Sequence, residues 1–155
     1  MVEVGSYHGK STVLLGSILK ELFPGAKLVS IDPHDGKLGA VDQGLKKFPP
    51  SYPYLKKNIE EAGLSAHVEM MQAHAYDVQW ESPISFLFID GLHDYANVSR
   101  DFNHFSGWVK SGAYIAFHDY IHYYPGVQQM VNELLSAGAY RKVRQVESLV
   151  IIQKL

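Results

Sequence analysis

The chain has 155 residues, and its hydrophobic content of 46% is enough to build one domain with a sizeable core. The formal net charge is −2, from 14 Lys and Arg against 16 Asp and Glu, which excludes the strongly basic surface typical of nucleic-acid-binding proteins. Cysteine is absent, so disulfides and thiolate metal sites are excluded, and any metal must use His and carboxylate ligands. No apolar run reaches the ~20 residues of a membrane span, and no targeting signal is recognisable. We therefore expect a single domain over residues 1–155, located in the cytoplasm, with neither nucleic acid nor membrane as a partner.

Apolar runs of strand length alternate with segments of helical periodicity, which is typical of βαβ units and a parallel sheet. The chain begins directly with a buried strand, so it is either a minimal version of its fold or lacks upstream helices. The last two runs are too close together for a helical crossover and predict an antiparallel hairpin. The expected strands are Val2–Val4, Lys27–Ile31, His67–Gln72, Ile84–Ile89, Ala113–Phe117, Tyr140–Val146 and Leu149–Gln153, and the expected helices are Gly9–Phe23, Tyr54–Ala62, Tyr95–Val109 and Val127–Ser136.

One connection is too long for an ordinary loop of a compact domain. It runs from Asp35 to Pro53 and is rich in Gly, Pro and Lys. Long connections of this kind usually carry function. The sequence therefore predicts a partly helical flap close to a binding site.

The first strand runs into a turn with the sequence Val4-Gly5-Ser6-Tyr7-His8-Gly9-Lys10-Ser11. A phosphate-binding loop needs four residues between its two glycines, and this turn has only Ser6, Tyr7 and His8. Tyr7 also replaces the middle glycine that a dinucleotide-binding turn requires. A ligand without phosphates fits better. Two alternatives remain, namely a tight turn without a ligand and a nucleotide-triphosphate enzyme that uses Lys10.

Two further strand ends carry candidate ligand-binding residues. Asp32 ends the second strand about twenty residues after the glycine turn, where doubly wound folds place an acid that binds ribose hydroxyls, although an Asp before Pro33 is also a common turn former. The third strand leads into Gln72-Ala73-His74, which is polar enough to edge a purine pocket. His74 fits a solvated loop equally well.

The ends of the fourth and fifth strands carry the densest group of polar residues. Because neighbouring parallel strands end at the same edge of a sheet, Asp90 and the pair His118-Asp119 are expected to meet and could hold one divalent cation. An imidazole of His93, His118 or His122 could instead act as a general base. The structural alternative is that Asp94 caps the following helix and that Asp119 and His122 only form loop hydrogen bonds.

Four motifs in this order, VEVGSYHGKST, LVSIDPH, FLFIDGLHDYANVSRDF and SGAYIAFHDY, resemble the class I S-adenosylmethionine-dependent methyltransferases. The resemblance spans essentially the whole chain. It implies an α/β, doubly wound, Rossmann-like fold with a seven-stranded, mostly parallel sheet of order 3-2-1-4-5-7-6, in which strand 7 is antiparallel.

The resemblance also implies a set of cofactor-binding residues. Glu3, Gly5, Ser6, Tyr7 and Ser11 would surround the methionine part of S-adenosylmethionine. Asp32 would bind the ribose, Ala73 and His74 would flank the adenine, and Asp90 would complete the site.

Related metal-dependent O-methyltransferases carry an acid that matches Asp90 and a polar pair that matches His118 and Asp119, so the resemblance implies a cation such as Mg²⁺ at these three residues. That pair is usually Asp-Asn or Glu-Asp, and the histidine at 118 departs from it. We expect methyl transfer to a hydroxyl of a small molecule or sugar, with Asp90, His93 and His118 as catalytic residues. The alternative is a non-catalytic cofactor-binding or assembly module. The aromatic stretch Tyr120–Tyr124 could line the acceptor pocket or form a homodimer interface.

Overall fold

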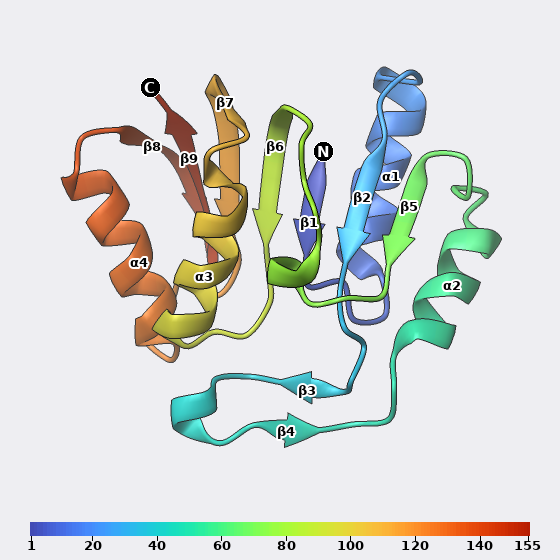
Figure 1. The fold of residues 1–155 in the computed structure, drawn as a ribbon, viewed down its shortest axis with the longest axis horizontal. Coiled ribbons are helices and arrows are strands. Elements are labelled where there is room, and N and C mark those ends of the chain that lie inside the picture. The colour runs from blue at the N-terminus through green and yellow to red at the C-terminus, as the bar shows by residue number, and fades with distance from the viewer.

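The computed structural model describes all 155 residues, and seven strands form its main sheet in the order β5-β2-β1-β6-β7-β9-β8. This is the order 3-2-1-4-5-7-6 implied by the resemblance, and β9 is antiparallel to both of its neighbours, as expected. The other pairs are parallel, and these strands end at the same edge of the sheet (Figure 1). The strands are β1 (Val2–Val4), β2 (Leu28–Ile31), β5 (Val68–Met71), β6 (Ile84–Ile89), β7 (Val109–Phe117), β8 (Tyr140–Val146) and β9 (Leu149–Lys154).

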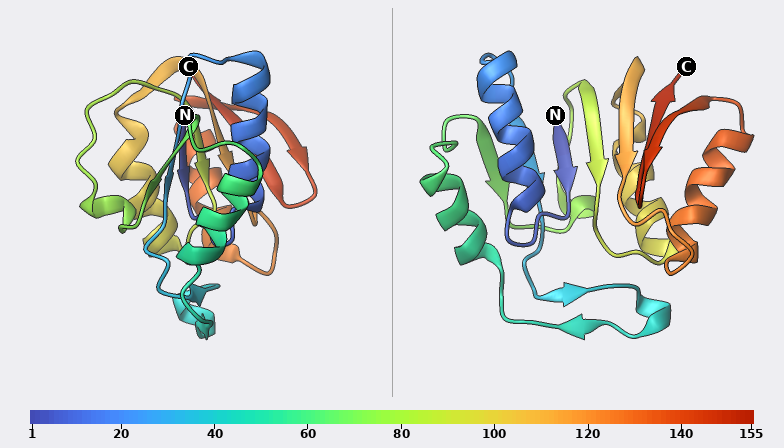
Figure 2. Two further views of the ribbon diagram at one scale, coloured as in Figure 1. Left: turned by 90° about the vertical axis from the view of Figure 1, so that its right-hand side faces the viewer. Right: turned by 180° about the vertical axis from the view of Figure 1, so that it is seen from behind.

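Four helices cover the two faces of this sheet (Figure 2). On one face, α1 (Lys10–Leu22) and α2 (Tyr52–Glu61) enclose a smaller apolar cluster that includes Leu19, Leu28 and Leu55. On the other face, α3 (Tyr95–Ser106) and α4 (Pro125–Ser136) pack over the larger cluster of buried residues. The doubly wound prediction is therefore confirmed.

Several element boundaries differ from the prediction. The helix expected to reach Val109 ends at Ser106, and β7 begins at Val109 instead of Ala113. The amide of Ile84 donates to the carbonyl of Trp108 at 2.8 Å, and a register shift between Ile84 and Phe86 accommodates the additional β7 residues. Helix α2 begins at Tyr52 because a proline at the first positions of a helix loses no hydrogen bond.

The connection after β2 is a hairpin with a short helical tip. Strands β3 (Lys37–Leu38) and β4 (Lys46–Lys47) pair antiparallel around the 3₁₀ turn η1 (Val41–Gln43), and we call residues 37–47 the strap. The strap lies across the end of the sheet toward which the parallel strands point (Figure 1). The expected flap is thus confirmed in position, but it is mostly extended.

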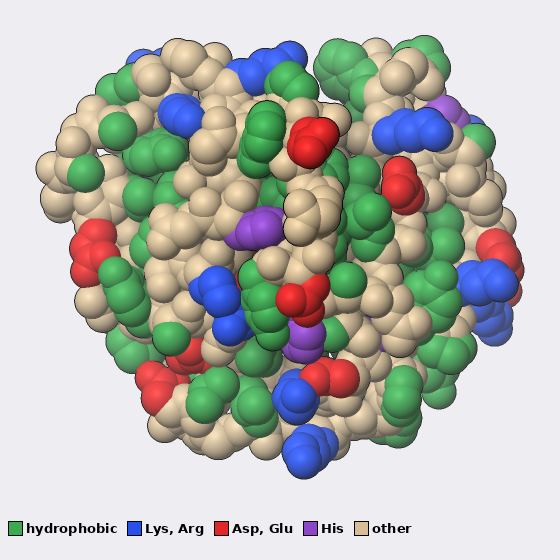
Figure 3. Space-filling model, in the orientation of Figure 1, with side chains coloured by type: hydrophobic (Ala, Val, Ile, Leu, Met, Phe, Trp, Pro, Cys, Tyr) green, Lys and Arg blue, Asp and Glu red, His purple; other side chains and the backbone are tan.

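Three hydrogen bonds fasten the strap to the loops after β6 and β7. The amide of His93 donates to Gly39 O at 2.9 Å, the amide of Val41 donates to Asp94 Oδ2 at 3.1 Å, and Gln43 Nε2 donates to Tyr123 O at 2.6 Å. Charged side chains are spread over the face shown in Figure 3 and include some at this end of the molecule. None of the helices has the length and apolar character that a membrane span requires.

Candidate active site

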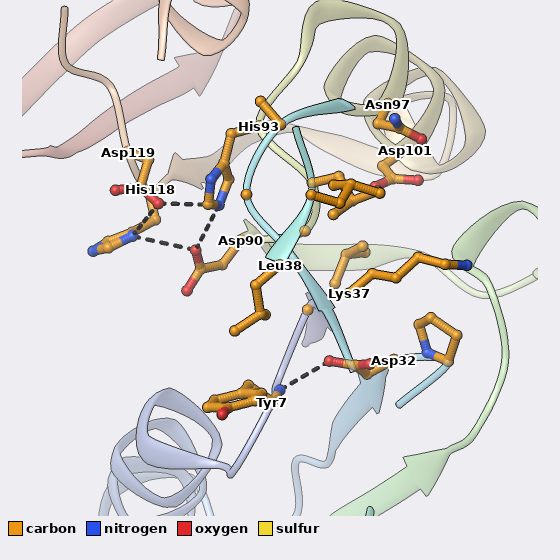
Figure 4. Close-up of a pocket in the computed structure, with 18 of the residues that line it drawn as sticks. Tyr7, Asp32, Lys37, Leu38, Asp90, His93, Asn97, Asp101, His118 and Asp119 are labelled. Atoms are coloured by element: carbon orange, nitrogen blue, oxygen red, sulfur yellow. Dashed lines mark hydrogen bonds and ion pairs between the residues drawn. The ribbon is translucent and has the colours of Figure 1, made fainter. Parts of the chain in front are cut away.

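A pocket of about 850 Å³ lies between the strap and the carboxyl ends of β1, β2, β6 and β7. This volume lies in the range of small-molecule sites. The pocket occupies the switch point of the sheet, where doubly wound folds bind their ligands. Its polar lining includes Tyr7, Ser11, Asp32, His74, Asp90, His93, Asn97, Arg100, Asp101, His118 and Asp119, of which Figure 4 labels most.

Asp32 organises the turn between β1 and α1. Its Oδ2 accepts hydrogen bonds from the amides of Ser6 and Tyr7 at 2.9 and 2.8 Å, and its Oδ1 accepts one from the amide of His34 at 2.6 Å. These bonds hold Tyr7 in the left-handed region, at φ 48°. A carboxylate has about four acceptor positions. Asp32 therefore forms the turn, as the structural alternative proposed, and keeps acceptor capacity toward the pocket.

Gly5 brings this turn into contact with the end of β6. Its φ is +85°, and a Cβ built on it would lie 2.1 Å from the carbonyl oxygen of Asp90. Only glycine fits a backbone approach this close. The turn and the cluster around Asp90 are therefore walls of one site.

Glu3, which was expected to contact the cofactor, lies beneath the turn, is fully buried and is not among the residues that line the pocket. Its Oε2 accepts hydrogen bonds from Thr12 Oγ1 at 2.6 Å and Ser30 Oγ at 2.8 Å, whereas Oε1 has no partner. Burial raises the pKa of Glu3, although the hydroxyl hydrogen bonds oppose this shift. Ser6 Oγ is also buried without a partner. Such unpaired groups are rare in native structures, and Ser6, which lines the pocket, thus leaves a polar atom for a ligand.

The wall expected to flank a purine differs in part from the prediction. His74 lines the pocket, and its ring stacks on Tyr76 of η2 (Ala75–Asp77) with centroids 5.0 Å apart. Ala73 packs against the main core and is not among the lining residues. The facing wall comes from α3, whose Arg100 guanidinium lies 3.9 Å from the centre of the Tyr76 ring.

Sequence reasoning missed the α3 residues Asn97, Arg100 and Asp101. The sequence does contain one feature that could have identified Asp101. This residue falls on the helix face that carries the buried residues Val98, Phe102 and Phe105, and a charged residue on the apolar face of a helix is uncommon.

The ends of β6 and β7 bring together Asp90, His93, His118 and Asp119 (Figure 4). His93 Nε2 lies 3.0 Å from Asp119 Oδ2 and 3.9 Å from Asp90 Oδ1. His118 Nδ1 lies 3.2 Å from each of the same two oxygens. Asp119 has a φ of 57°, a strained conformation for a residue other than glycine and one often found at functional sites.

The two imidazoles have opposite electrostatic environments. Ion-pair contacts with Asp119 and Asp90 raise the pKa of His118 to about 10. Burial lowers the pKa of His93 below its usual value, although Asp119 and Asp90 oppose the shift. Burial acts to raise the pKa of Asp119, but His118 and His93 outweigh it and the net shift is downward. At neutral pH, His118 is therefore cationic and His93 neutral.

The donor set fits a divalent cation. One ligand atom each from Asp90, His93 and Asp119 lies within 4.8 Å of the others, and oxygen and imidazole donors suit several divalent ions. His118, the histidine expected as a ligand, faces the same two carboxylates with its side chain 41% exposed. The donor group therefore contains His93 in place of the expected His118.

The remaining predicted residues divide into two groups. Asp94 caps α3, accepting from the amide of Asn97 at 3.1 Å, as the structural alternative proposed. Tyr123 and Tyr124 line the pocket, with the Tyr124 ring 4.3 Å from that of His93. Tyr120 instead donates its hydroxyl to Asn132, and the exposed His122 lies outside the pocket lining.

Residues 2–120 match a family described as a methyltransferase domain. The chain belongs to the class I S-adenosylmethionine-dependent methyltransferases. Uncharacterized protein R132 of Acanthamoeba polyphaga mimivirus is 31% identical over 151 residues, which cover 90% of this chain and 62% of that protein. The present chain therefore spans less than two thirds of the length of this relative.

Solved methyltransferases share the fold at low identity. The O-methyltransferase NovP superposes with a TM-score of 0.80 at 18% identity, over 99% of this chain and 71% of NovP. The calicheamicin methyltransferase CalS11 gives 0.78 at 14% identity, over 99% and 71% of the two chains. An O-methyltransferase from Bacillus cereus, solved in complex with SAH, gives 0.70 at 19% identity, over 99% and 73%.

Proposed function

We propose that this methyltransferase binds S-adenosylmethionine along the β1–α1 turn and transfers its methyl group to a hydroxyl of a small molecule or sugar. The contact between Gly5 and the carbonyl of Asp90 carries the proposal, because it sets the turn directly beside the cluster of His93, His118 and the two aspartates. A donor held by the turn and an acceptor held by the cluster would thus meet within one pocket. Proximity of this kind contributes much of the acceleration in a displacement reaction.

The turn side supplies groups for the donor. Ser6 Oγ is a buried polar atom without a partner on the pocket wall. Glu3 Oε1 is also unpaired behind that wall, and as a carboxylate it would suit the ammonium group of a methionine moiety. Asp32 retains lone pairs for ribose hydroxyls. When bound, S-adenosylmethionine supplies an electrophilic methyl group, and its transfer leaves S-adenosylhomocysteine and a methyl ether.

The cluster side supplies the base. His93 is neutral at neutral pH and lines the pocket, so its imidazole can take the proton of an acceptor hydroxyl placed beside it. Asp119, 3.0 Å away, then stabilises the imidazolium form of His93. His118 and Asp90 orient the hydroxyl. A divalent cation held by Asp90, His93 and Asp119 would instead lower the pKa of that hydroxyl, and His93 would then be a ligand and not the base.

The test uses S-adenosylmethionine with a tritiated methyl group and a panel of catechols, simple phenols and methyl glycosides. We expect label in a hydroxyl-bearing acceptor. His93→Gln should lower kcat by about 10² to 10³ while leaving affinity for the donor unchanged, because one general base contributes about this much. The matched control is His122→Gln, which removes an exposed imidazole outside the pocket. Transfer only to amines, or a kcat insensitive to His93→Gln, would contradict the proposed chemistry. Donor binding by a protein that labels no acceptor favours the non-catalytic module.

The cation is tested separately with Mn²⁺ as a spectroscopic probe. Electron paramagnetic resonance should show binding to the wild-type protein and at least about tenfold weaker binding to Asp119→Asn. Asp42→Asn, which changes an exposed strap carboxylate, is the control. Equal Mn²⁺ binding by all three proteins would remove the metal from the proposal.

A further inference from the structure

The strap forms one wall of the pocket and has little internal structure to hold it there. Residues along its whole length line the pocket, so it covers any ligand bound inside. Each of its two strands has only two residues, and Ala40 is its only buried residue. Segments with so few buried contacts open readily. The strap therefore depends on its bonds to neighbouring loops to stay closed over the pocket.

Two of these bonds are made with the loop that carries His93. The amide of His93 itself donates to the carbonyl of Gly39 at 2.9 Å. The next residue, Asp94, accepts from the strap amide of Val41 at 3.1 Å. Both bonds are lost when the strap moves away from the loop, so the backbone of His93 has a fixed position only while the strap is closed.

The same loop also packs against the start of α4. A Cβ built on Gly126 would lie 2.3 Å from the amide nitrogen of Tyr95 and 2.9 Å from the carbonyl oxygen of His93. The ring of Tyr124, two residues before Gly126, lies 4.3 Å from the ring of His93. The loop of His93 is therefore supported by two elements, the strap and the segment that leads into α4.

Gln43 joins these two supports to each other. Its Nε2 donates to the carbonyl of Tyr123 at 2.6 Å, across 80 residues of the chain. No other side chain of the strap donates to a residue outside the connection between β2 and α2. We propose that Gln43 is a positioning residue, whose bond to Tyr123 couples closure of the strap to the placement of His93. The inference rests on the proposed function, in which His93 acts as the base or, with a cation, as a ligand.

Hydrogen exchange of single backbone amides, followed by NMR, tests the coupling without an acceptor. Gln43→Ala removes the donor, and Gln43→Glu keeps its shape but sets a carboxylate against the carbonyl of Tyr123. The amide of His93 should exchange about fivefold faster in Gln43→Ala, the effect expected of one exposed hydrogen bond, and faster still in Gln43→Glu. The amide of Tyr7, which donates to Asp32 in the β1–α1 turn, should keep its exchange rate and so report an intact fold.

Steady-state kinetics with an acceptor from the labelling test gives the second readout. We expect kcat to fall by about two- to fivefold in Gln43→Ala, because fewer molecules hold His93 in place, and to fall further in Gln43→Glu. The acceptor KM should change less than kcat does. The matched control is Gln79→Glu, which makes the same change at an exposed residue outside the pocket lining and should alter neither readout.

Three results would overturn the inference. The first is an unaltered exchange rate of the His93 amide in both Gln43 variants. The second is an unaltered rate together with a raised acceptor KM, which would make Gln43 an acceptor contact. The third is faster exchange with an unaltered kcat, which would show that the strap does not place the base. A kcat insensitive to His93→Gln would instead contradict the proposed function, and the exchange rates would still decide whether Gln43 holds the loop.

Discussion

The two walls of the pocket are held in place by different kinds of interaction. In the turn wall, one carboxylate, Asp32, accepts hydrogen bonds from three backbone amides. In the wall formed by the cluster and α3, titratable side chains face one another, His93 Nδ1 is buried without a partner, and Asp101 is unpaired. Hydrogen bonds from the backbone therefore fix the conformation of the turn. The second wall depends on protons and on its ligands, so removing the unpaired carboxylate of Asp101 should have the opposite effect to removing that of Asp32.

The largest effect should come from the point where the walls touch. Gly5→Ala places a Cβ 2.1 Å from the carbonyl oxygen of Asp90, at a φ of +85° that side chains disfavour. Backbone on both sides must move, and we expect a loss of about 4 kcal/mol in the free energy of unfolding. Urea denaturation measures it. Gly25→Ala, with open space around the added methyl, is the control and should change little. A loss below about 1 kcal/mol for Gly5→Ala would show that the walls are not in rigid contact.

Within the turn wall, removal of the carboxylate should destabilise the protein. Asp32→Ala leaves the amides of Ser6, Tyr7 and His34 without their acceptor, for which we expect a loss of about 3 kcal/mol. Asp32→Asn keeps one acceptor oxygen and should therefore lose less free energy of unfolding than Asp32→Ala. Urea denaturation of both variants at neutral pH gives the comparison. Equal stability of Asp32→Ala and the wild-type protein would mean that the turn forms without its carboxylate.

In the second wall, removal of the unpaired carboxylate of Asp101 should stabilise the protein. Burial raises the pKa of Asp101 from 3.8 to about 6, so the native state holds this proton more tightly than the unfolded chain does. The free energy of unfolding therefore falls as pH rises from about 4 to 6. Above that range Asp101 is ionised in both states, and the full cost of burying its charge applies. Asp101→Asn should gain about 2 kcal/mol at pH 8 and almost nothing at pH 4. Urea denaturation at the two pH values checks this. A gain that is equal at both would assign the effect to packing instead of charge.

The sheet could be predicted from the sequence because each strand is a short apolar run between turn residues, and because the spacing of Tyr140–Val146 and Leu149–Lys154 excludes a crossover. The place of the strap near the site could be predicted as well, but its extended conformation could not, because residues 37–47 make their contacts with residues far away in the chain. The amide of Val41 donates to Asp94, for example, and Gln43 donates to the carbonyl of Tyr123. The residues of the strap alone do not indicate which distant residues they will contact.

The site was predictable where its residues end strands and not where they lie within a helix. Asp90, His118 and Asp119 follow strands β6 and β7, so parallel pairing alone brings them together. Asp101 lies in the middle of α3, and its place in the pocket depends on how that helix rotates against the sheet. A charged residue on an apolar helix face marks Asp101 as unusual in the sequence, but it does not show that the side chain lies in the pocket.

The smallest effect should come from the most exposed member of the cluster. Asp119 and Asp90 raise the pKa of His118 to about 10, so in metal-free protein its cationic form stabilises the fold fully below about pH 6.5 and loses this contribution as pH rises to about 10. Because 41% of its side chain is exposed, solvent screening reduces the contribution to about 0.5–1 kcal/mol. His118→Gln should therefore cost this amount at pH 7 and nothing near pH 10.5, as measured by urea denaturation with a chelator present. His122→Gln should be neutral at both pH values. A loss in free energy of unfolding that persists at pH 10.5 would mean that packing, and not charge, holds His118 between the two carboxylates. The dependence of the second wall on protonation would then not include this residue.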